Sequence, residues 1–354
     1  MSQYDVPVVW SPTTRLHDPH HEVWVGVTTP AVEVAARVDA ILAALADFPL
    51  VEASASPSSA LASVHSAGLL GFLESAWSRW AGAGYAEEVG QDRVVPYLFP
   101  TPAMTGGIPL SVPARVHAEA GSYAYDTMTL VGPGTWEAAS AAAACAVEAA
   151  SLVGSGSSLA YALCRPPGHH ATLGGFGGAC YLNNAAVAAV SLRAAGHERV
   201  GIVDLDAHQG NGTAAIFWSR SDVLYGSVHV DPAAGWFPHY VGFASETGAG
   251  DGIGATRNLP LEPGTGDGPW LAAVSSLADW VVSAGCTALV VSLGVDAAVD
   301  DPESPLEVTH DGYHRAGELL RHTGLPAVVV QEGGYHLPTL GSLVRAYLTG
   351  HAGT

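Results

Sequence analysis

Short, uninterrupted apolar runs recur along the chain, separated by stretches in which apolar residues are three or four positions apart. Runs of this kind are typical of strands buried on both faces, and the wider spacing predicts helices that cover a sheet. The predicted strands lie near Val8–Trp10, Ala160–Leu163, 200–203, 223–229, 288–293 and 327–330. The predicted helices are Pro30–Leu45, Trp136–Leu152, Asn184–Ala195 and Pro269–Ser283.

This alternation favours an α/β protein with a mostly parallel central sheet between two layers of helices. We expect a single three-layer α/β/α domain over residues 1–354, without internal repeats. Segments rich in glycine and proline at 94–115 and 231–268 are predicted to be long structured loops. Loops of this length commonly shape the mouth of an active site.

Two carboxylates and an imidazole follow the apolar run 200–203. Alternate residues of a strand share a face, so Asp204, Asp206 and His208 are expected to point the same way. Such a cluster after a buried strand is costly without a cation, and both residue types are ordinary zinc ligands. The alternative is a set of polar residues at a strand end, turned to solvent.

Further candidates each lie just beyond an apolar run. His169 and His170 follow a Pro-Pro-Gly turn, Asp296 ends the run 288–295, and Tyr335 follows Glu-Gly-Gly. In open α/β sheets, sites form at the carboxyl ends of strands. Two aspartates and a histidine for a metal, a histidine pair for acid–base chemistry and a tyrosine for an oxyanion indicate a mononuclear metal hydrolase.

Five motifs occur in an order and spacing that resemble the histone deacetylase superfamily. They are Arg165–His170, Gly178–Asn184, Asp204–Thr213, Ser292–Pro302 and Glu332–Tyr335. The resemblance covers nearly the whole chain. Within the superfamily the likeness is nearest to the bacterial acetylpolyamine amidohydrolases. It rests on the segments Val64–Tyr85, Pro133–Glu137, Phe237–Gly248 and Val291–Asp296.

The resemblance implies a zinc-dependent deacetylase that hydrolyses a small N-acetyl or N-acyl amine, such as an acetylpolyamine, acetyl-lysine or another acylated metabolite. Asp206, His208 and Asp296 match the ligands of one zinc per subunit. Fe²⁺ or Co²⁺ can replace zinc in such a site, and a structural K⁺ is compatible with the family. His169 and His170 match the catalytic histidines, with His170 as the base and either one as the acid for the departing amine.

The resemblance also assigns residues around the metal. Asp204 and Asn211 match the residues that orient His169 and His170, respectively. Tyr335 matches the hydroxyl that binds the substrate carbonyl. The backbone of Gly178 matches a position that accepts the amide N–H of the substrate.

Two aromatic rings commonly wall the channel of these enzymes, at positions that correspond to Ala179 and Phe237. Because Ala179 supplies only a methyl group, we expect a wider channel. A second possibility is that Trp236 or Tyr240 refills the gap.

In the polyamine enzymes, acidic residues bind the distal ammonium group of the substrate. Their positions correspond to His117 and Met128 in this chain, and neither of these residues is acidic. Glu119 and Asp126 lie close by, within reach of a small register error. Glu303, seven residues beyond Asp296, could supply a substrate-binding carboxylate instead. The alternative for Glu303 is a solvated loop residue.

Charge and composition limit the partners. The 13 basic residues are all arginine and face 33 acidic ones, a net charge of −20, which disfavours nucleic acids and anionic membranes and favours a cationic small molecule. Residues 1–25 lack the apolar core of a signal peptide, and no apolar run approaches 18 residues. The four cysteines form no C-x-x-C pair. We expect a cytoplasmic protein, and by resemblance a homodimer built through an inserted loop near 94–130.

Two other functions remain open. An arginase-type ureohydrolase would share the fold and read Asp-Ala-His-x-Asp, but Gly210 stands where the last aspartate should be. A non-catalytic acyl-ligand-binding protein on the same fold is the second. Retention of the metal ligands, both histidines and the tyrosine argues against it.

Overall fold

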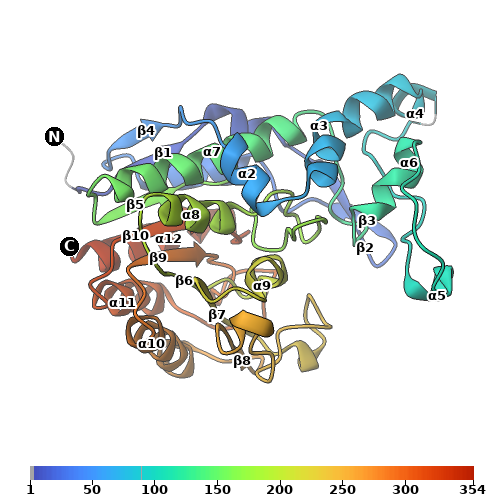
Figure 1. Ribbon diagram of the computed structural model, residues 1–354. Coiled ribbons are helices and arrows are strands. Elements are labelled where there is room, and N and C mark those ends of the chain that lie inside the picture. Colours follow the sequence, from blue (N-terminus) through green and yellow to red (C-terminus); the bar gives the residue numbers. More distant parts are fainter. Residues whose placement is uncertain (1–3, 89) are drawn as a thin grey trace.

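The computed structural model describes residues 4–88 and 90–354 and is built around an eight-stranded parallel sheet (Figure 1). Its strands are β1 (Val8–Trp10), β4 (Leu50–Glu52), β5 (Leu159–Ala162), β6 (Val200–Asp204), β7 (Val223–Val230), β8 (Thr256–Leu261), β9 (Ala288–Leu293) and β10 (Ala327–Gln331). Their order is β4-β1-β5-β10-β9-β6-β7-β8, and every neighbouring pair is parallel. A separate antiparallel hairpin joins β2 (His21–Trp24) to β3 (Val27–Pro30).

Helices cover both faces of the sheet. One face carries α2 (Ser58–Val64), α3 (Ala67–Gly82), α7 (Thr135–Gly154), α8 (Asn184–Ala194) and α9 (Asn211–Phe217). The other carries α1 (Ala36–Ala44), α10 (Asp267–Ser283), α11 (His310–Arg321) and α12 (Leu337–Ala352). Short helical turns are α4 (Tyr85–Glu88), α5 (Pro102–Thr105), α6 (Val116–Glu119), η1 (Pro12–Leu16), η2 (Ala120–Ser122), η3 (Pro232–Ala234) and η4 (Gly250–Gly252).

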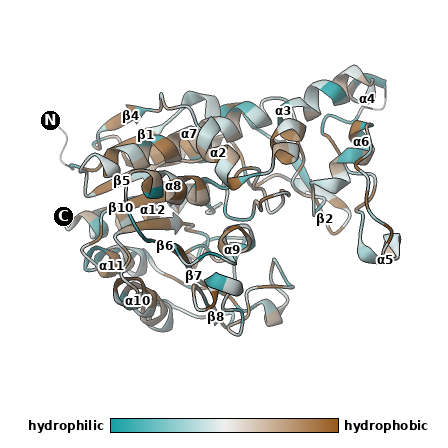
Figure 2. Cartoon of the chain, in the orientation of Figure 1, coloured by the Kyte–Doolittle hydropathy of each residue, from teal (hydrophilic) through white to brown (hydrophobic). Residues whose placement is uncertain are grey.

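The central strands are apolar at nearly every position because both of their faces are buried. In β6, Val200 and Ile202 join the apolar cluster under α7 and α8, whereas Val203 joins the cluster under α10. Figure 2 shows hydrophobic colouring concentrated in the middle of the molecule, where α7 and α8 lie along the sheet. The expected three-layer α/β/α fold with a mostly parallel sheet is confirmed.

All six predicted strands are present, but the predicted helix Pro30–Leu45 is wrong in its first part. Pro30 ends β3, where it pairs with His21, and the helix begins only at Ala36. The backbone N–H of Ala35 donates to the Asp18 carboxylate at 2.9 Å, and this bond helps to set where α1 begins. Asp18 lies outside the apolar pattern from which the helix was predicted.

The prediction that 231–268 is entirely loop is also wrong, because the segment contains β8. This strand pairs with β7 along its whole length and forms the edge of the sheet. Pro260 lies within it, and proline is tolerated there because an edge strand needs no second set of hydrogen bonds. The three-residue β4 was missed as well.

The statement that no apolar run approaches 18 residues needs correction at α7. Within the described residues this is the one helix long and apolar enough to cross a membrane, although half of its most apolar window is buried. It packs against β5 and α8. These contacts are typical of a core helix, and core helices can be as long and as apolar as helices that span a membrane.

The segment 94–130 lies at one side of the molecule, with α5 and α6 extending away from the sheet beside the β2–β3 hairpin (Figure 1). A bridge between Val94 and Val131 closes its base. Its last part returns to the body, where Ala124 forms a parallel bridge with Phe176. The segment therefore reaches the loop that follows the histidine pair.

Candidate active site

The candidate residues meet at the carboxyl ends of three neighbouring strands. In the sheet β6 lies beside β9, and β9 lies beside β10. Asp204 ends β6, Asp296 follows β9, and the turn Glu332–Tyr335 follows β10. The parallel register brings these three ends to one edge, as the sequence predicts.

Asp206, His208 and Asp296 form a compact set of ligand atoms. The Nδ1 atom of His208 lies 3.1 Å from Asp206 Oδ1 and 2.9 Å from Asp296 Oδ2. Around a tetrahedral zinc with bonds of 2.0–2.1 Å, neighbouring ligand atoms lie about 3.3 Å apart. The set therefore fits one small divalent cation with little movement.

The prediction that Asp204, Asp206 and His208 share one face of a strand is wrong. The strand β6 ends at Asp204, so Asp206 and His208 do not share a strand face with it. They lie in the turn beyond the strand, where the backbone N–H of His208 donates to Asp206 Oδ1 at 2.9 Å. Asp206 and His208 converge because hydrogen bonds within the turn orient the Asp206 carboxylate. The Asp204 carboxylate contacts His169 instead.

The burial of two adjacent carboxylates demands a positive charge. Asp206 is 1% and Asp296 is 0% exposed, and neither forms an ion pair with an arginine in the described part of the chain. Burial, and then the charge of Asp206, raise the pKa of Asp296 to about 7. A bound cation would reverse this shift and keep both carboxylates ionised.

Glycine at position 333 allows the β10 turn to approach the ligands. Its N–H donates to Asp206 Oδ2 at 2.8 Å. A Cβ atom on Gly333 would lie 2.6 Å from that same oxygen and 2.7 Å from Asp296 Oδ2, closer than real contacts allow. The backbone here therefore requires glycine and orients the two carboxylates.

Tyr335 is held by the same turn. Its backbone N–H donates to Asp301 Oδ2 at 2.6 Å, and the Arg37 guanidinium lies 4.8 Å from the centre of its ring. Burial holds the pKa of the Tyr335 phenol well above its usual value. The hydroxyl therefore stays protonated at neutral pH and can donate to an oxygen.

Arg37 was not among the residues predicted to contribute to the site. Its guanidinium donates to the carbonyls of Glu332 (2.6 Å) and Gly334 (2.7 Å) and to Glu33 (2.7 Å), while Arg165 binds Glu33 at 2.9 Å. This buried network ties α1 to the turn that carries Tyr335. Charged residues on a helix usually face solvent, so no local pattern distinguishes it.

Each histidine of the pair has its own partner. His169 Nδ1 lies 3.1 Å from Asp204 Oδ2, and His170 Nδ1 lies 2.7 Å from Asn211 Oδ1. An amide oxygen only accepts, so His170 carries its proton on Nδ1 and leaves Nε2 with a free lone pair. The predicted partners of both histidines are thus in contact with them.

The two histidines differ in charge. Burial lowers the pKa of His169, but the carboxylates of Asp206 and Asp204 outweigh it and raise the pKa to about 10. The pKa of His170 lies well below its usual value because of burial and then the positive charge of His169. A neutral imidazole beside a charged one is an arrangement suited to general base catalysis.

A second group, His169, Cys180 and Glu332, also has the composition of a metal site. Here Glu332 Oε2 already accepts the backbone N–H groups of Gly168 (2.6 Å) and His169 (3.1 Å). These bonds fix the turn before the histidine pair. The contacts therefore indicate a structural role for this group, and all four cysteines are buried and unpaired.

The wall residues lie next to His170. The Phe237 ring is perpendicular to the His170 ring, with centroids 4.8 Å apart. A Cβ atom on Gly178 would lie 2.4 Å from the His170 ring and 3.0 Å from Phe237, so only a glycine fits between them. Ala179 follows with a φ of 61°, a left-handed conformation that is unusual for alanine.

The inserted segment does not place a free acid at the positions expected from polyamine enzymes. Glu119 is paired with Arg79, and His117 bonds to the Tyr85 hydroxyl at 2.6 Å. Asp126 accepts the N–H of Gly178 at 2.6 Å and therefore braces the wall.

Two acids, Glu303 and Glu22, lie within electrostatic range of each other, and Glu303 lies within electrostatic range of His208. The pKa of Glu303 is raised above its usual value, because the effect of burial outweighs the opposing effect of His208. Burial, and then the charge of Glu303, raise the pKa of Glu22 to about 7. Glu22 lies on β2, and no sequence pattern predicted that it would lie near Glu303.

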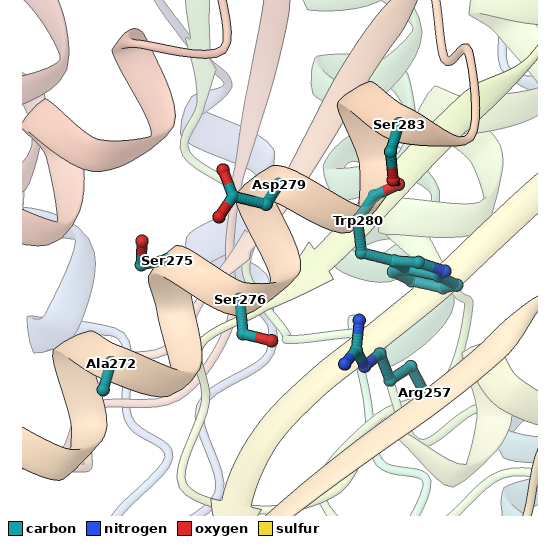
Figure 3. Close-up of a pocket in the computed structure, with 7 residues that line it drawn as sticks. All are labelled: Arg257, Ala272, Ser275, Ser276, Asp279, Trp280 and Ser283. Carbon is teal, nitrogen blue, oxygen red and sulfur yellow. The ribbon is translucent and has the colours of Figure 1, made fainter.

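A hollow of about 440 Å³ lies between α10 and β8 (Figure 3). It is lined by Arg257, Ala272, Ser275, Ser276, Asp279, Trp280 and Ser283. It contains none of the candidate site residues. The hollow is therefore separate from the candidate site at the strand ends.

Known proteins share these features over almost the whole chain. The acetylpolyamine amidohydrolase of Mycoplana ramosa is 40% identical over 349 residues, which cover 98% of this chain and 99% of that protein. Acetylpolyamine amidohydrolase 1 of Pseudomonas aeruginosa is 37% identical over 348 residues, 98% of each chain. The crystal structure of acetylpolyamine aminohydrolase from Burkholderia pseudomallei matches with a TM-score of 0.91 and 38% identity, covering 98% of both chains.

The model of the histone deacetylase domain matches residues 31–351. This range contains all the candidate metal ligands and histidines. Together with the near full-length relatives, it confirms the resemblance that the five motifs indicated: the chain belongs to the histone deacetylase family.

Proposed function

We propose that this protein is a zinc-dependent amidohydrolase that releases the acyl group, in the first place acetyl, from a small N-acylated amine. The observation that carries the proposal is the arrangement at the strand ends. A three-ligand metal set lies beside a neutral His170 whose Nε2 is free. We further propose that residues 1–354 form one catalytic domain with an inserted loop near 94–130. The acetylpolyamine amidohydrolases named above support an amide substrate.

The donor set fits zinc. Two carboxylate oxygens and one imidazole nitrogen, with a fourth position left for substrate or water, are typical of catalytic zinc, and Fe²⁺ or Co²⁺ accept the same donors. A zinc ion held by Asp206, His208 and Asp296 would polarise the amide carbonyl and lower the pKa of a water molecule toward ~7.

The protein residues perform the proton transfers. His170 takes the proton of the attacking water on Nε2, because Asn211 holds its other nitrogen protonated. The Tyr335 hydroxyl donates to the carbonyl oxygen as negative charge develops there. His170 then returns the proton to the nitrogen as the C–N bond breaks, which yields the amine and a carboxylic acid; the acid releases its remaining proton to solvent or to the amine at neutral pH. His169 holds its own proton too tightly for this step and stabilises the charge instead.

The structure disfavours the ureohydrolase. That reaction uses two metals, and its extra aspartate would replace Gly210. A Cβ atom at Gly210 would lie 2.5 Å from Asp204 Oδ2, so the larger side chain does not fit this backbone. A non-catalytic binding protein would not require a neutral His170 next to a protonated His169, so this pair favours a catalytic role.

A cationic amine is the substrate we propose. Glu303 and Glu22 are both partly buried and within electrostatic range of each other, and Glu303 is also within range of His208. Two ionised carboxylates within electrostatic range repel each other, and an ammonium group between them would relieve the repulsion. The net charge of −20 adds a long-range attraction for a polyamine or a lysine side chain.

We also propose that the protein is a cytoplasmic homodimer that neither binds nucleic acid nor inserts in membranes. Exposed apolar side chains gather in the inserted segment: Tyr97, Leu98, Met104, Ile108, Leu110 and Val112, which are 41–82% exposed. Apolar side chains concentrated on one projecting segment favour burial in an interface. A second copy of the chain is the partner that we infer for it.

The metal site can be tested by replacing its ligands. Asp296→Asn removes one of the two buried charges, so the variant should lose the single equivalent of zinc that the wild type binds after metal loading. Cys180→Ala should keep it. Elemental analysis of dialysed protein measures both, and loss of zinc from Cys180→Ala alone would move the site to the second group.

The catalytic assignment predicts two separate losses at constant metal content. His170→Ala should lower kcat by about 10²–10⁴-fold, the usual range for a general base. Tyr335→Phe should lower it by about 10²–10³-fold, as for one oxyanion donor. Acetate release from a panel of acetylpolyamines, acetyl-lysine peptides and small acetylated metabolites provides the measurement. Near-wild-type turnover of zinc-loaded His170→Ala would refute its role as the base.

The pKa of Glu22 predicts a pH dependence of substrate binding. Because this pKa is raised to about 7, Glu22 is mostly neutral at pH 6 and mostly ionised at pH 8; Glu303, Glu33 and Asp126 are the charged groups that face it. KM for a cationic acetylamine, relative to a matched neutral acetylamide, should therefore fall by up to about fivefold over this range.

Two variants separate the contributions of the acids. Glu22→Gln should make the ratio of the two KM values independent of pH. Glu303→Gln should raise KM for the cationic substrate alone. Equal changes for the neutral acetylamide would remove both acids from the substrate site.

The oligomeric state gives the fourth test. Light scattering at micromolar concentration should give a mass of about twice 36.2 kDa. Ile108→Asp combined with Met104→Asp should shift the protein toward the monomer, because the new charges would be buried in the interface. Val282→Asp, an exposed valine on α10, serves as the matched control. A monomeric wild type contradicts the proposal.

A further inference from the structure

One wall of the proposed channel lacks its aromatic ring, because Ala179 contributes only a methyl group. The nearby candidates do not replace it. Tyr240 is 88% exposed, and Trp236 packs against the apolar cluster under α10. A ring that restores the wall must therefore come from another part of the chain.

Tyr125, from the end of the inserted segment, lies against the same loop. Its backbone N–H donates to the Phe176 carbonyl at 3.1 Å. Its ring passes so close to Gly177 that a Cβ atom there would lie 2.2 Å from Cε2. Its hydroxyl donates to the carbonyl oxygen of His170 at 2.8 Å. The ring thus spans from Gly177, two residues before Ala179, to the backbone of His170.

The neighbours of Tyr125 bind the following residues of the wall in turn. Asp126 accepts the N–H of Gly178 at 2.6 Å, and the Thr129 hydroxyl accepts the N–H of Ala179 at 2.8 Å. These bonds hold Ala179 in its left-handed conformation. The two segments therefore form one structural unit, and the position of Tyr125 relative to the wall is fixed.

We propose that Tyr125 replaces the missing wall ring and, through its hydroxyl, positions the backbone of His170. Tyr125 is 38% exposed, so its side chain is accessible to a ligand from solvent. The hydroxyl fixes the main chain of His170, while Asn211 fixes its imidazole. The inference rests on the proposed function, because it concerns the channel through which that substrate enters.

The two roles belong to different atoms and can be separated. Tyr125→Phe keeps the ring and removes the hydroxyl, whereas Tyr125→Leu removes both. Tyr123→Phe is a matched control: the same substitution two residues away, at a ring that stacks on Phe72 at 5.0 Å.

The width of the channel can be measured without turnover. Zinc-loaded protein is titrated calorimetrically with acetohydroxamate and benzohydroxamate, two chelators that differ in bulk. In Tyr125→Leu the ratio of the two Kd values should shift toward the bulky ligand by roughly tenfold, as for a steric change in a pocket. Tyr125→Phe and Tyr123→Phe should keep the wild-type ratio. Adding Ala179→Tyr to Tyr125→Leu should restore it.

The hydroxyl is tested by kinetics on the best acetylamine of the panel. Tyr125→Phe should lower kcat by about fivefold with KM unchanged, the effect of losing one hydrogen bond to the base. Tyr125→Leu should in addition raise KM, and Tyr123→Phe should change neither.

The results that overturn the inference differ from those that overturn the function. An unchanged hydroxamate ratio in Tyr125→Leu removes the ring from the wall, even if the wild type deacetylates its substrate. Equal kcat and KM effects of Tyr125→Phe and Tyr123→Phe remove the positioning role. A wild type that binds hydroxamates but hydrolyses no amide refutes the proposed function alone, because the titration still tests the wall.

Discussion

The structure depends on two carboxylates, Asp206 and Asp296, that are buried side by side in a protein with a net charge of −20. Burying a charge is unfavourable unless an opposite charge accompanies it. Under the proposed function, a cation at the strand ends supplies that charge, with His208 as the third ligand. The neighbouring residues are arranged around this requirement: Gly333 permits close approach, and Arg37 holds the turn in place from behind.

The same constraint explains why two adjacent histidines differ. His169 lies 3.7 Å from Asp206 and 3.1 Å from Asp204, so the carboxylates hold it positive. That charge, together with burial, keeps His170 neutral. One electrostatic cause therefore produces both a charged and a neutral imidazole. A metal would weaken the pull of Asp206, but Asp204 would still favour the proton on His169.

The sequence was most informative where chemistry and strand ends coincide. Asp204 to His208 and Asp296 were predictable because a polar cluster after a buried strand has few explanations. Other contributors were not predictable. Arg37 lies on a helix that seemed ordinary, Glu22 lies on a hairpin for which no strand was predicted, and β8 contains a proline. Each acts through a partner distant in the chain, and no local pattern encodes such a contact.

The chemistry and the specificity of this protein are carried by different parts of the chain. The candidate site leaves little freedom, because a Cβ atom added at Gly178, Gly210 or Gly333 would meet the His170 ring or a carboxylate oxygen within 2.7 Å. In our proposals, a channel wall and a substrate-binding acid are instead supplied by Tyr125 and Glu22, from segments outside the main sheet. Loss of a ring at position 179 can therefore be compensated from the inserted segment without disturbing the metal. Changes of substrate in such a fold are expected to arise first in these outer segments.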